Sequence, residues 1–437
     1  MPDLLSNVVA FVFALGVIIF VHEAGHLVVA KLFGTRVLTF SLGFGKRLWG
    51  FQRGETDYRV SLVPLGGYVR LGGEEPGEVS DDPREFLNKP RWQRILVYLA
   101  GPSMNIVLSI LLIAVLFMIG IQVPMLKNVE PVVGLVVAGS RAEEAGILPG
   151  DRVVAVDGEP VQSWEQVQFA LMTAPEQPVA LEIERREARF DVEVTPRMVE
   201  KYEFGDAGLA PQFLPRVTQV FDDSPAEAAG LEVGDELRAV AGRPVSDSAG
   251  FVEVIQQSAG EAVELGVVRE GRPLTLTVVP EGEPGEGRIG IGLGILQRYG
   301  PLEAVAASVV YNIDIARQTF AVLGKIVTGG LSARSISGPI EIAAMSGAAA
   351  RTGFRNLLYL MGLISISIAI LNLLPIPLLD GGQIFILLIE SVRQRDLSLP
   401  VKERIHQVGF YMIVMLMVVV LYFDLVKNLP EGLLPGS

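Results

Sequence analysis

Four long apolar runs divide this chain, and the stretches between them are rich in charged and turn-forming residues. An α-helix rises 1.5 Å per residue, so about 20 apolar residues cross the hydrocarbon core of a bilayer. Each run has roughly that length, and 50% of all residues are hydrophobic. The pattern predicts a polytopic α-helical membrane protein with four transmembrane helices, at residues 4–33, 95–121, 357–374 and 408–425.

The first run begins so close to the N-terminus that a secretory signal peptide is an alternative interpretation. Such a peptide has a basic segment, a short apolar core and a small-residue cleavage site. Here no Lys or Arg precedes Lys31, and the apolar run continues past His22 and His26. We therefore expect an uncleaved span.

Basic residues near the span ends predict the orientation, because cytoplasmic loops are enriched in Lys and Arg. They cluster between spans one and two and between spans three and four. We therefore expect both termini and the long loop between spans two and three on the exoplasmic side. The basic residues are Lys31, Arg36, Lys46, Arg47, Arg53, Arg59, Arg70, Arg84, Lys89, Arg91 and Arg94 in the first group, and Arg393, Arg395, Lys402 and Arg404 in the second.

The long loop carries most of the formal net charge of −13 and has no basic stripe, which argues against nucleic acid as a partner. The chain contains no cysteine, so the loop must be held by its own hydrophobic core. Any metal site must use nitrogen and oxygen ligands.

Within this loop a set of residues recurs with a period of 84 residues. Each copy predicts a strand, a short helical turn ending at Gly, a Gly-Asp turn and a second strand. The predicted strands are Leu135–Val137 and Val153–Val156, then Val217–Phe221 and Leu237–Val240. The recurring residues are Ser140, Ala142, Glu143, Ala145, Gly146, Gly150, Asp151, Gly158, Pro160 and Val161, repeated as Ser224, Ala226, Glu227, Ala229, Gly230, Gly234, Asp235, Gly242, Pro244 and Val245.

The two copies resemble PDZ domains of the form found in bacterial proteases. The resemblance implies two inserted, mainly β domains with a groove that binds peptide or protein ligands by strand addition. A passive spacer is the alternative. Residues 301–331 predict an amphipathic helix near the membrane surface. The expected organisation is membrane domain 1–121, PDZ domains 122–210 and 211–295, an exoplasmic helical region 296–355 and membrane domain 356–437.

His22, Glu23 and His26 form an HExxH motif inside the first span. Histidines at i and i+4 share one helical face, and with the adjacent glutamate as general base they form the arrangement of a zinc hydrolase. A charge at the centre of a bilayer costs roughly 2.5 to 3.5 kcal/mol on insertion scales, so ionisable residues there usually serve function.

The third span runs into a segment that no simple membrane helix would contain, Asn372 to Gly382. Pro375 and Pro377 break the helix, and such a break can turn a carboxylate inward. Asp380 is the preferred third ligand, completing a site with an open position for water. The alternatives are His406, Glu390 and the loop carboxylate Asp57.

Together with Gly101, Pro102 and Asn105 (GPxxN) in the second span and the PDZ pair, HExxH and NxxPxPxLDGG make the chain similar to the site-2 protease family of intramembrane zinc metalloproteases. The resemblance implies a bacterial cytoplasmic (inner) membrane protein with periplasmic PDZ domains, Zn²⁺ as cofactor and a site toward the cytoplasmic side. One departure is Gln383, where the family often has His.

The resemblance also implies residues that bind substrate. Asn372 would hold the substrate or its oxyanion, although it could instead cap backbone freed by Pro375. Residues 37–71, with predicted strands Val37–Leu42 and Arg59–Val63, resemble a membrane re-entrant β-hairpin on the cytoplasmic side. Gly66, Gly67 and Tyr68 would pair with unwound substrate there. An ordinary cytoplasmic hairpin is the alternative.

The expected function is hydrolysis of peptide bonds within or near the spans of single-span membrane proteins in the bilayer. Substrates would be anti-sigma-factor-like proteins or remnant signal peptides, cut after a first exoplasmic cleavage, with the PDZ pair gating access. A non-enzymatic PDZ scaffold with a vestigial metal site is the alternative. A transporter is disfavoured, because the spans show no inverted repeat.

Overall fold

The computed structural model describes residues 2–74, 81–120, 129–199, 203–212, 215–245, 248–283, 285–294 and 299–428. The chain forms two compact units. The helical unit comprises Met1–Ile119, Tyr299–Ala321 and Ile336–Ser437, and the β unit comprises Gly120–Arg298 and Val322–Ser335.

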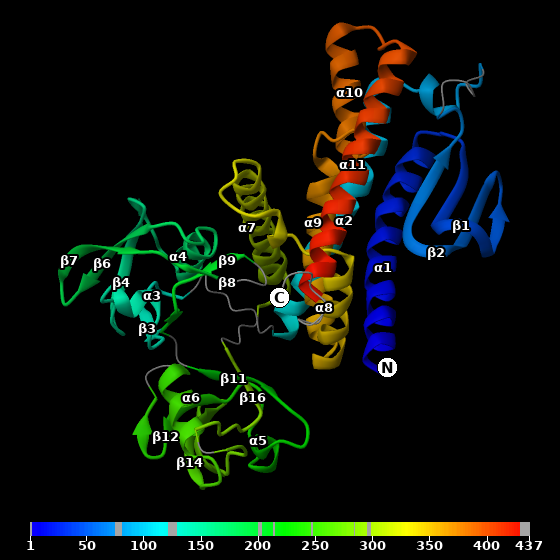
Figure 1. The fold of residues 1–437 in the computed structure, drawn as a ribbon. Coiled ribbons are helices and arrows are strands. Elements are labelled where there is room, and N and C mark those ends of the chain that lie inside the picture. Colours follow the sequence, from blue (N-terminus) through cyan, green and yellow to red (C-terminus); the bar gives the residue numbers. More distant parts are fainter. Residues whose placement is uncertain are drawn as a thin grey trace. The chain divides into compact units, whose positions relative to one another are not determined.

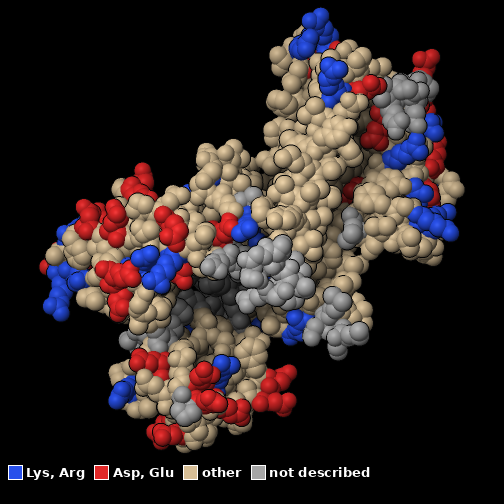
Figure 2. All heavy atoms as spheres, viewed as in Figure 1, with Lys and Arg blue, Asp and Glu red and all other residues tan. Residues whose placement is uncertain are grey.

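Four helices are long and apolar enough to cross a membrane: α1 (Pro2–Leu32), α2 (Arg91–Ile119), α9 (Phe354–Leu373) and α11 (Leu399–Asn428). They coincide with the four predicted spans, and α2 packs against both α1 and α9 (Figure 1). The helix α11 begins at Leu399 rather than Val408, because it continues through polar turns that hydropathy does not count as membrane. On the face shown in Figure 2, the helices carry few charged side chains along most of their length.

Three further helices complete the helical unit. They are α7 (Pro301–Val327), whose first part lies in this unit, α8 (Pro339–Thr352) and α10 (Asp380–Arg393). The helix predicted at residues 301–331 is present as α7, but it ends at Val327 and residues 328–331 form a turn. Its buried Asn312 accepts a hydrogen bond from Ser109 of α2 at 2.6 Å, so this part of α7 packs on a membrane-length helix. Two short 3-10 turns lie at Phe86–Asn88 and Ala333–Ser335.

A long hairpin, β1 (Val37–Arg53) and β2 (Thr56–Leu71), lies beside α1 (Figure 1). Both strands extend beyond the predicted segments, because the alternation of small, aromatic and β-branched residues continues toward the turn. The register places Val37–Leu42 against residues 67–71 and also against residues 57–60. Within the register of this sheet, residues 67–71 therefore pair with a strand on one side only.

The β unit contains two sheets of similar construction. The first has the order β5-β4-β6-β7, and the second has β15-β14-β12-β11-β16 with β13 on β12. Small pairs β10-β3 and β8-β9 accompany the first sheet. The first group consists of β3 (Val133–Val136), α3 (Arg141–Glu144), β4 (Arg152–Val156), β5 (Glu159–Pro160), α4 (Trp164–Met172), β6 (Val179–Arg185), β7 (Ala188–Val194), β8 (Arg197–Val199), β9 (Phe204–Asp206) and β10 (Leu209–Pro211). The second consists of β11 (Arg216–Val220), α5 (Pro225–Ala228), β12 (Glu236–Val240), β13 (Arg243–Pro244), α6 (Ser248–Gln257), β14 (Val263–Arg269), β15 (Arg272–Val278) and β16 (Ile291–Gly294).

The repeat of 84 residues is confirmed by equivalent contacts in the two halves. Arg185 binds Asp151 at 2.6 Å, and Arg269 binds Asp235 at 2.8 Å. Each guanidinium also donates to a glycine carbonyl at 2.7 Å. The hydrogen bond to the buried aspartate raises the pKa of each arginine. Each half has its own apolar core, one around Trp164 and Leu181 and the other around Leu237 and Phe251, as a chain without disulfides requires.

Candidate active site

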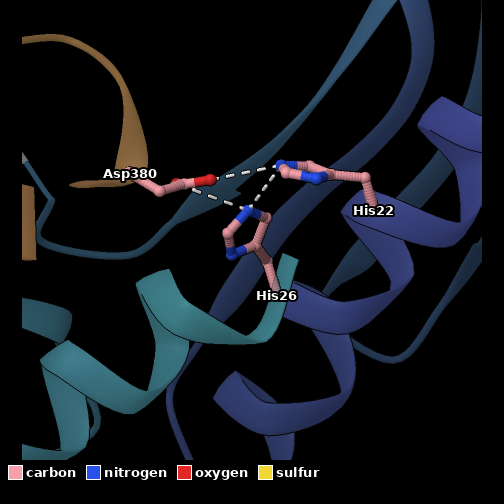
Figure 3. A group of neighbouring side chains, drawn as sticks. All are labelled: His22, His26 and Asp380. Carbon is pink, nitrogen blue, oxygen red and sulfur yellow. Dashed lines mark hydrogen bonds and ion pairs between the residues drawn. The ribbon is translucent and has the colours of Figure 1, made fainter. Parts of the chain in front are cut away.

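Three side chains from two distant parts of the chain meet in the helical unit (Figure 3). His22 Nε2 lies 3.2 Å from Asp380 Oδ2, and His26 Nε2 lies 3.5 Å from Asp380 Oδ1. The two Nε2 atoms are themselves 3.2 Å apart. The potential ligand atoms all lie within 4.8 Å of one another, so they face a common point.

The histidines converge because they are one helical turn apart on α1. The aspartate reaches them because α9 ends at Leu373 and a non-helical segment returns the chain to α10, which begins at Asp380. The helix break expected at the prolines is therefore confirmed. Leu378 in this segment has a φ of 80°.

Two glycines that follow Asp380 allow the segment between α9 and α10 to pack closely against the first turn of α10. A Cβ on Gly381 would meet the backbone of Leu373, and one on Gly382 would meet Ile376. The loop backbone thus lies directly against the first turn of α10. A larger residue at either position would displace the turn that carries Asp380.

A cavity of about 1010 Å³ adjoins the group and is lined by His22, Glu23, His26 and Asp380. Gly67, Tyr68 and Asn372, which the family resemblance implies as substrate-binding residues, line it too. Gly66 does not appear in the lining; a Cβ there would meet the Phe44 ring, which stacks on Tyr68 at 6.1 Å.

The hairpin approaches the candidate base directly. A Cβ on Gly67 would lie 2.9 Å from Glu23 Cγ and 2.8 Å from Ile19 Cγ2. Only a residue without a side chain allows the strand this close to α1. The sheet edge at residues 67–71 therefore lies beside the Glu23 side chain and the cavity.

The other ligand candidates are engaged elsewhere in the described part of the chain. His406 Nε2 is 3.2 Å from Gln383 Nε2, Glu390 pairs with Lys402 at 2.7 Å, and Asp57 pairs with Arg47 at 3.3 Å. His406, Glu390 and Gln383 nevertheless line the cavity, together with Arg94. Glu390 was an alternative ligand in the sequence analysis, whereas Arg94 and Lys402, which also line the cavity, were not predicted as site residues; only their polarity near the span ends could have indicated it.

Helix α2 contacts both imidazoles along one of its faces. His26 Nδ1 lies 2.7 Å from the carbonyl oxygen of Val97, and His22 Nδ1 lies 3.2 Å from Asn105 Nδ2. A Cβ on Gly101 would meet the Nε2 of both rings, lying 2.7 Å from that of His22. Gly101 and Asn105 belong to the GPxxN motif, whose spacing places both on one face of the helix.

The donor set fits a zinc ion. Two imidazole nitrogens and one carboxylate oxygen leave a tetrahedral position open for water, as in catalytic zinc sites. Gly101 keeps the space beside both Nε2 atoms clear of side-chain atoms.

Comparison with known proteins gives a consistent result. The model of peptidase family M50 matches residues 10–416. The regulator of sigma-E protease RseP of Escherichia coli is 34% identical over 97% of this chain and 99% of its own. A putative zinc metalloprotease of Vibrio cholerae is 32% identical over 98% and 100%. Among solved structures, a PDZ domain of an SdrC-like protein from Listeria monocytogenes is 24% identical, with a TM-score of 0.17, covering 18% of this chain and 85% of that one.

Proposed function

Because the chain belongs to peptidase family M50 and is an intramembrane zinc metalloprotease of the inner membrane, we propose that it cuts single-span membrane proteins within or beside their spans. The observation that carries the proposal is the convergence of His22, His26 and Asp380 beside Glu23 at one cavity. The chemistry needs a metal site and a base within reach of one peptide bond, and this cavity provides both.

We assign the zinc ligands to His22, His26 and Asp380. Zinc bound there would lower the pKa of a coordinated water and polarise the scissile carbonyl. The protein holds the three ligands on two rigid helices, α1 and α10, so little reorganisation is needed when the metal binds.

Glu23 is the proposed general base. Its side chain lines the cavity next to both histidines, within the same turn of α1. It takes a proton from the attacking water and delivers it to the leaving amine. Asn372, in the last turn of α9 and also in the cavity lining, is proposed to donate its amide hydrogens to the substrate carbonyl or the developing oxyanion.

The edge of the β1–β2 hairpin is the proposed binding site for unwound substrate. Residues 67–71 pair with one neighbouring strand in the register of the hairpin and form a sheet edge beside the cavity; a substrate strand added there would exchange helical hydrogen bonds for strand bonds. Large apolar side chains near the turn, including Leu48, Trp49 and Phe51, are exposed. Their exposure supports a hairpin that enters the membrane.

We further propose that the two mainly β domains lie on the periplasmic side with both termini. There they would exclude substrates that have not undergone a first cut. The basic residues at the opposite ends of the spans support this orientation. Anti-sigma-factor-like proteins and remnant signal peptides are the proposed substrates.

The test replaces the base without disturbing the ligands. Glu23→Gln should lower cleavage of a tagged single-span substrate in proteoliposomes by about 10²-fold to 10⁴-fold or more, while zinc content is unchanged. Glu403→Gln, in the lining of the same cavity, is the matched control and should cleave normally. Full cleavage by the Glu23 variant would refute the assignment.

A further inference from the structure

Helix α2 presents one stripe of residues to both candidate zinc ligands. Val97, Gly101 and Asn105 are four residues apart, so they follow one face of the helix. Val97 and Asn105 contact the two Nδ1 atoms, and Gly101 leaves room for the rings between them. We propose that Asn105 is a positioning residue that holds His22 in the tautomer needed for metal binding, as the Val97 carbonyl does for His26. The proposal rests on the metal site assigned above.

The chemistry of imidazole sets the requirement. A histidine that binds metal through Nε2 must offer a lone pair there, so its proton must lie on Nδ1 and needs an acceptor. In this site both Nε2 atoms face Asp380, and both Nδ1 atoms face α2. Helix α2 is therefore the element that must supply the two acceptors.

For His26 the acceptor is part of the backbone. The Val97 oxygen lies 2.7 Å from Nδ1, and a carbonyl oxygen can only accept. Nδ1 thus carries a proton, and the neutral ring keeps its Nε2 lone pair. No side-chain substitution removes this acceptor.

For His22 the partner is the Asn105 amide, which can act in two ways. Its Nδ2 faces Nδ1 at 3.2 Å, an arrangement in which Nδ1 accepts and Nε2–H points toward Asp380. A half-turn of the amide instead presents Oδ1, which accepts from Nδ1–H and frees Nε2 for the metal. When Nδ2 faces His22, as in the structure, the buried Asn105 Oδ1 has no hydrogen-bond partner among the described residues. It is therefore available to accept from His22 Nδ1–H after the amide turns.

Burial makes this contact hard to replace. Asn105 is 0% exposed, and its backbone carbonyl accepts a hydrogen bond from Ser365 of α9 at 2.8 Å. This bond anchors the backbone of α2 at that turn without occupying the amide. Bulk water therefore has no access to His22 Nδ1 from this side while α2 and α9 remain packed.

The test measures zinc affinity by chelator competition on the purified full-length protein. Asn105→Ala should bind zinc about 10- to 100-fold more weakly, the usual effect of losing a partner of a metal-bound histidine. Asn105→Asp should restore affinity to near the wild-type value, because its carboxylate oxygen accepts from Nδ1–H. Visible absorption of the cobalt-substituted proteins should report the same order.

Ser109→Ala is the matched control. Ser109 lies one turn further along the stripe, and its hydroxyl makes buried hydrogen bonds to the Gly362 carbonyl at 2.8 Å and to Asn312 rather than to an imidazole. Its zinc affinity should equal that of the wild type. Thermal unfolding of all variants with chelator present compares their folds; if Asn105→Ala does not fold, Asn105→Ser takes its place.

Three results would overturn the proposal: wild-type zinc affinity in folded Asn105→Ala, equal losses in the Ala and Asp variants, or an equal loss in Ser109→Ala. The zinc affinity of Asp380→Ala distinguishes a wrong role for Asn105 from a wrong assignment of the metal site. If Asp380→Ala binds zinc as tightly as the wild type, the assigned ligands are wrong; if only that variant loses zinc, Asn105 has no positioning role.

Discussion

At the scale of single residues, the acidic groups Asp380 and Glu390 of the helical unit each lie against polar or basic partners. Asp380 lies between two histidines, and Glu390, which is 0% exposed, pairs with Lys402 and accepts from the Leu397 amide at 2.8 Å. An isolated carboxylate at such a depth would be strongly destabilising. Each acidic group therefore requires its partner, and the partners of Asp380 are the residues that we propose bind zinc.

Gly101 should be the residue of α2 that tolerates a side chain least. In Gly101→Ala the new Cβ meets both Nε2 atoms, so the rings or the helix must move. We expect zinc affinity to fall about 10-fold or more, measured by chelator competition. Gly16→Ala on α1 is the control, because nothing lies within 4 Å of the added Cβ; comparable affinities in the two variants would contradict the expectation.

At the scale of elements, the site depends on where helices end and where a strand edge lies. The α9–α10 break delivers Asp380, α2 supports the histidines, and the hairpin brings residues 67–71 to Glu23. The exposed apolar residues near the hairpin turn form a hydrophobic surface whose contact with water is unfavourable. They give a direct test of whether this element enters the bilayer.

Trp49, 67% exposed, reports the depth of the hairpin. In vesicles containing brominated lipids, its fluorescence should be quenched because bromine contacts the ring. The chain has three tryptophans, so the signal is assigned by difference: Trp49→Phe should remove a quenched component, and Trp164→Phe, in the core of the first β domain, an unquenched one. Equal quenching in Trp49→Phe and the wild type would place the hairpin in water.

At the scale of the whole molecule, the helical unit contains the complete candidate site, and the larger segment of the β unit, Gly120–Arg298, is an insertion in its sequence. The insertion leaves and returns at neighbouring points, since the Tyr299 amide donates to the Phe117 carbonyl at 3.1 Å and their rings are 5.3 Å apart. The geometry allows the inserted domains to be removed with little strain on the helices.

Replacing residues 121–297 with a short Gly-Ser linker should therefore leave an active helical unit that no longer discriminates by substrate size. We expect untrimmed single-span substrates to be cleaved by the deletion variant and rejected by the full chain, in the same proteoliposome assay. Trimmed substrate is the control and should be cleaved by both. Continued rejection of untrimmed substrate would remove the gating role.

Features that depend on local sequence pattern were predicted correctly before the structure was known. Hydropathy located four membrane-length helices, the 84-residue period located two related domains, and the two prolines located the helix break before Asp380. HExxH predicted that His22 and His26 share a face, because helical geometry follows from spacing alone.

Which distant groups meet depends on the tertiary structure. It brings Asp380, rather than His406, Glu390 or Asp57, to His22 and His26, and it places Gly67 against Glu23. It also revealed that Val97 and Asn105 support the imidazoles. These contacts join residues tens to hundreds of positions apart, and they arise from helix packing and chain reversal, which no local periodicity specifies.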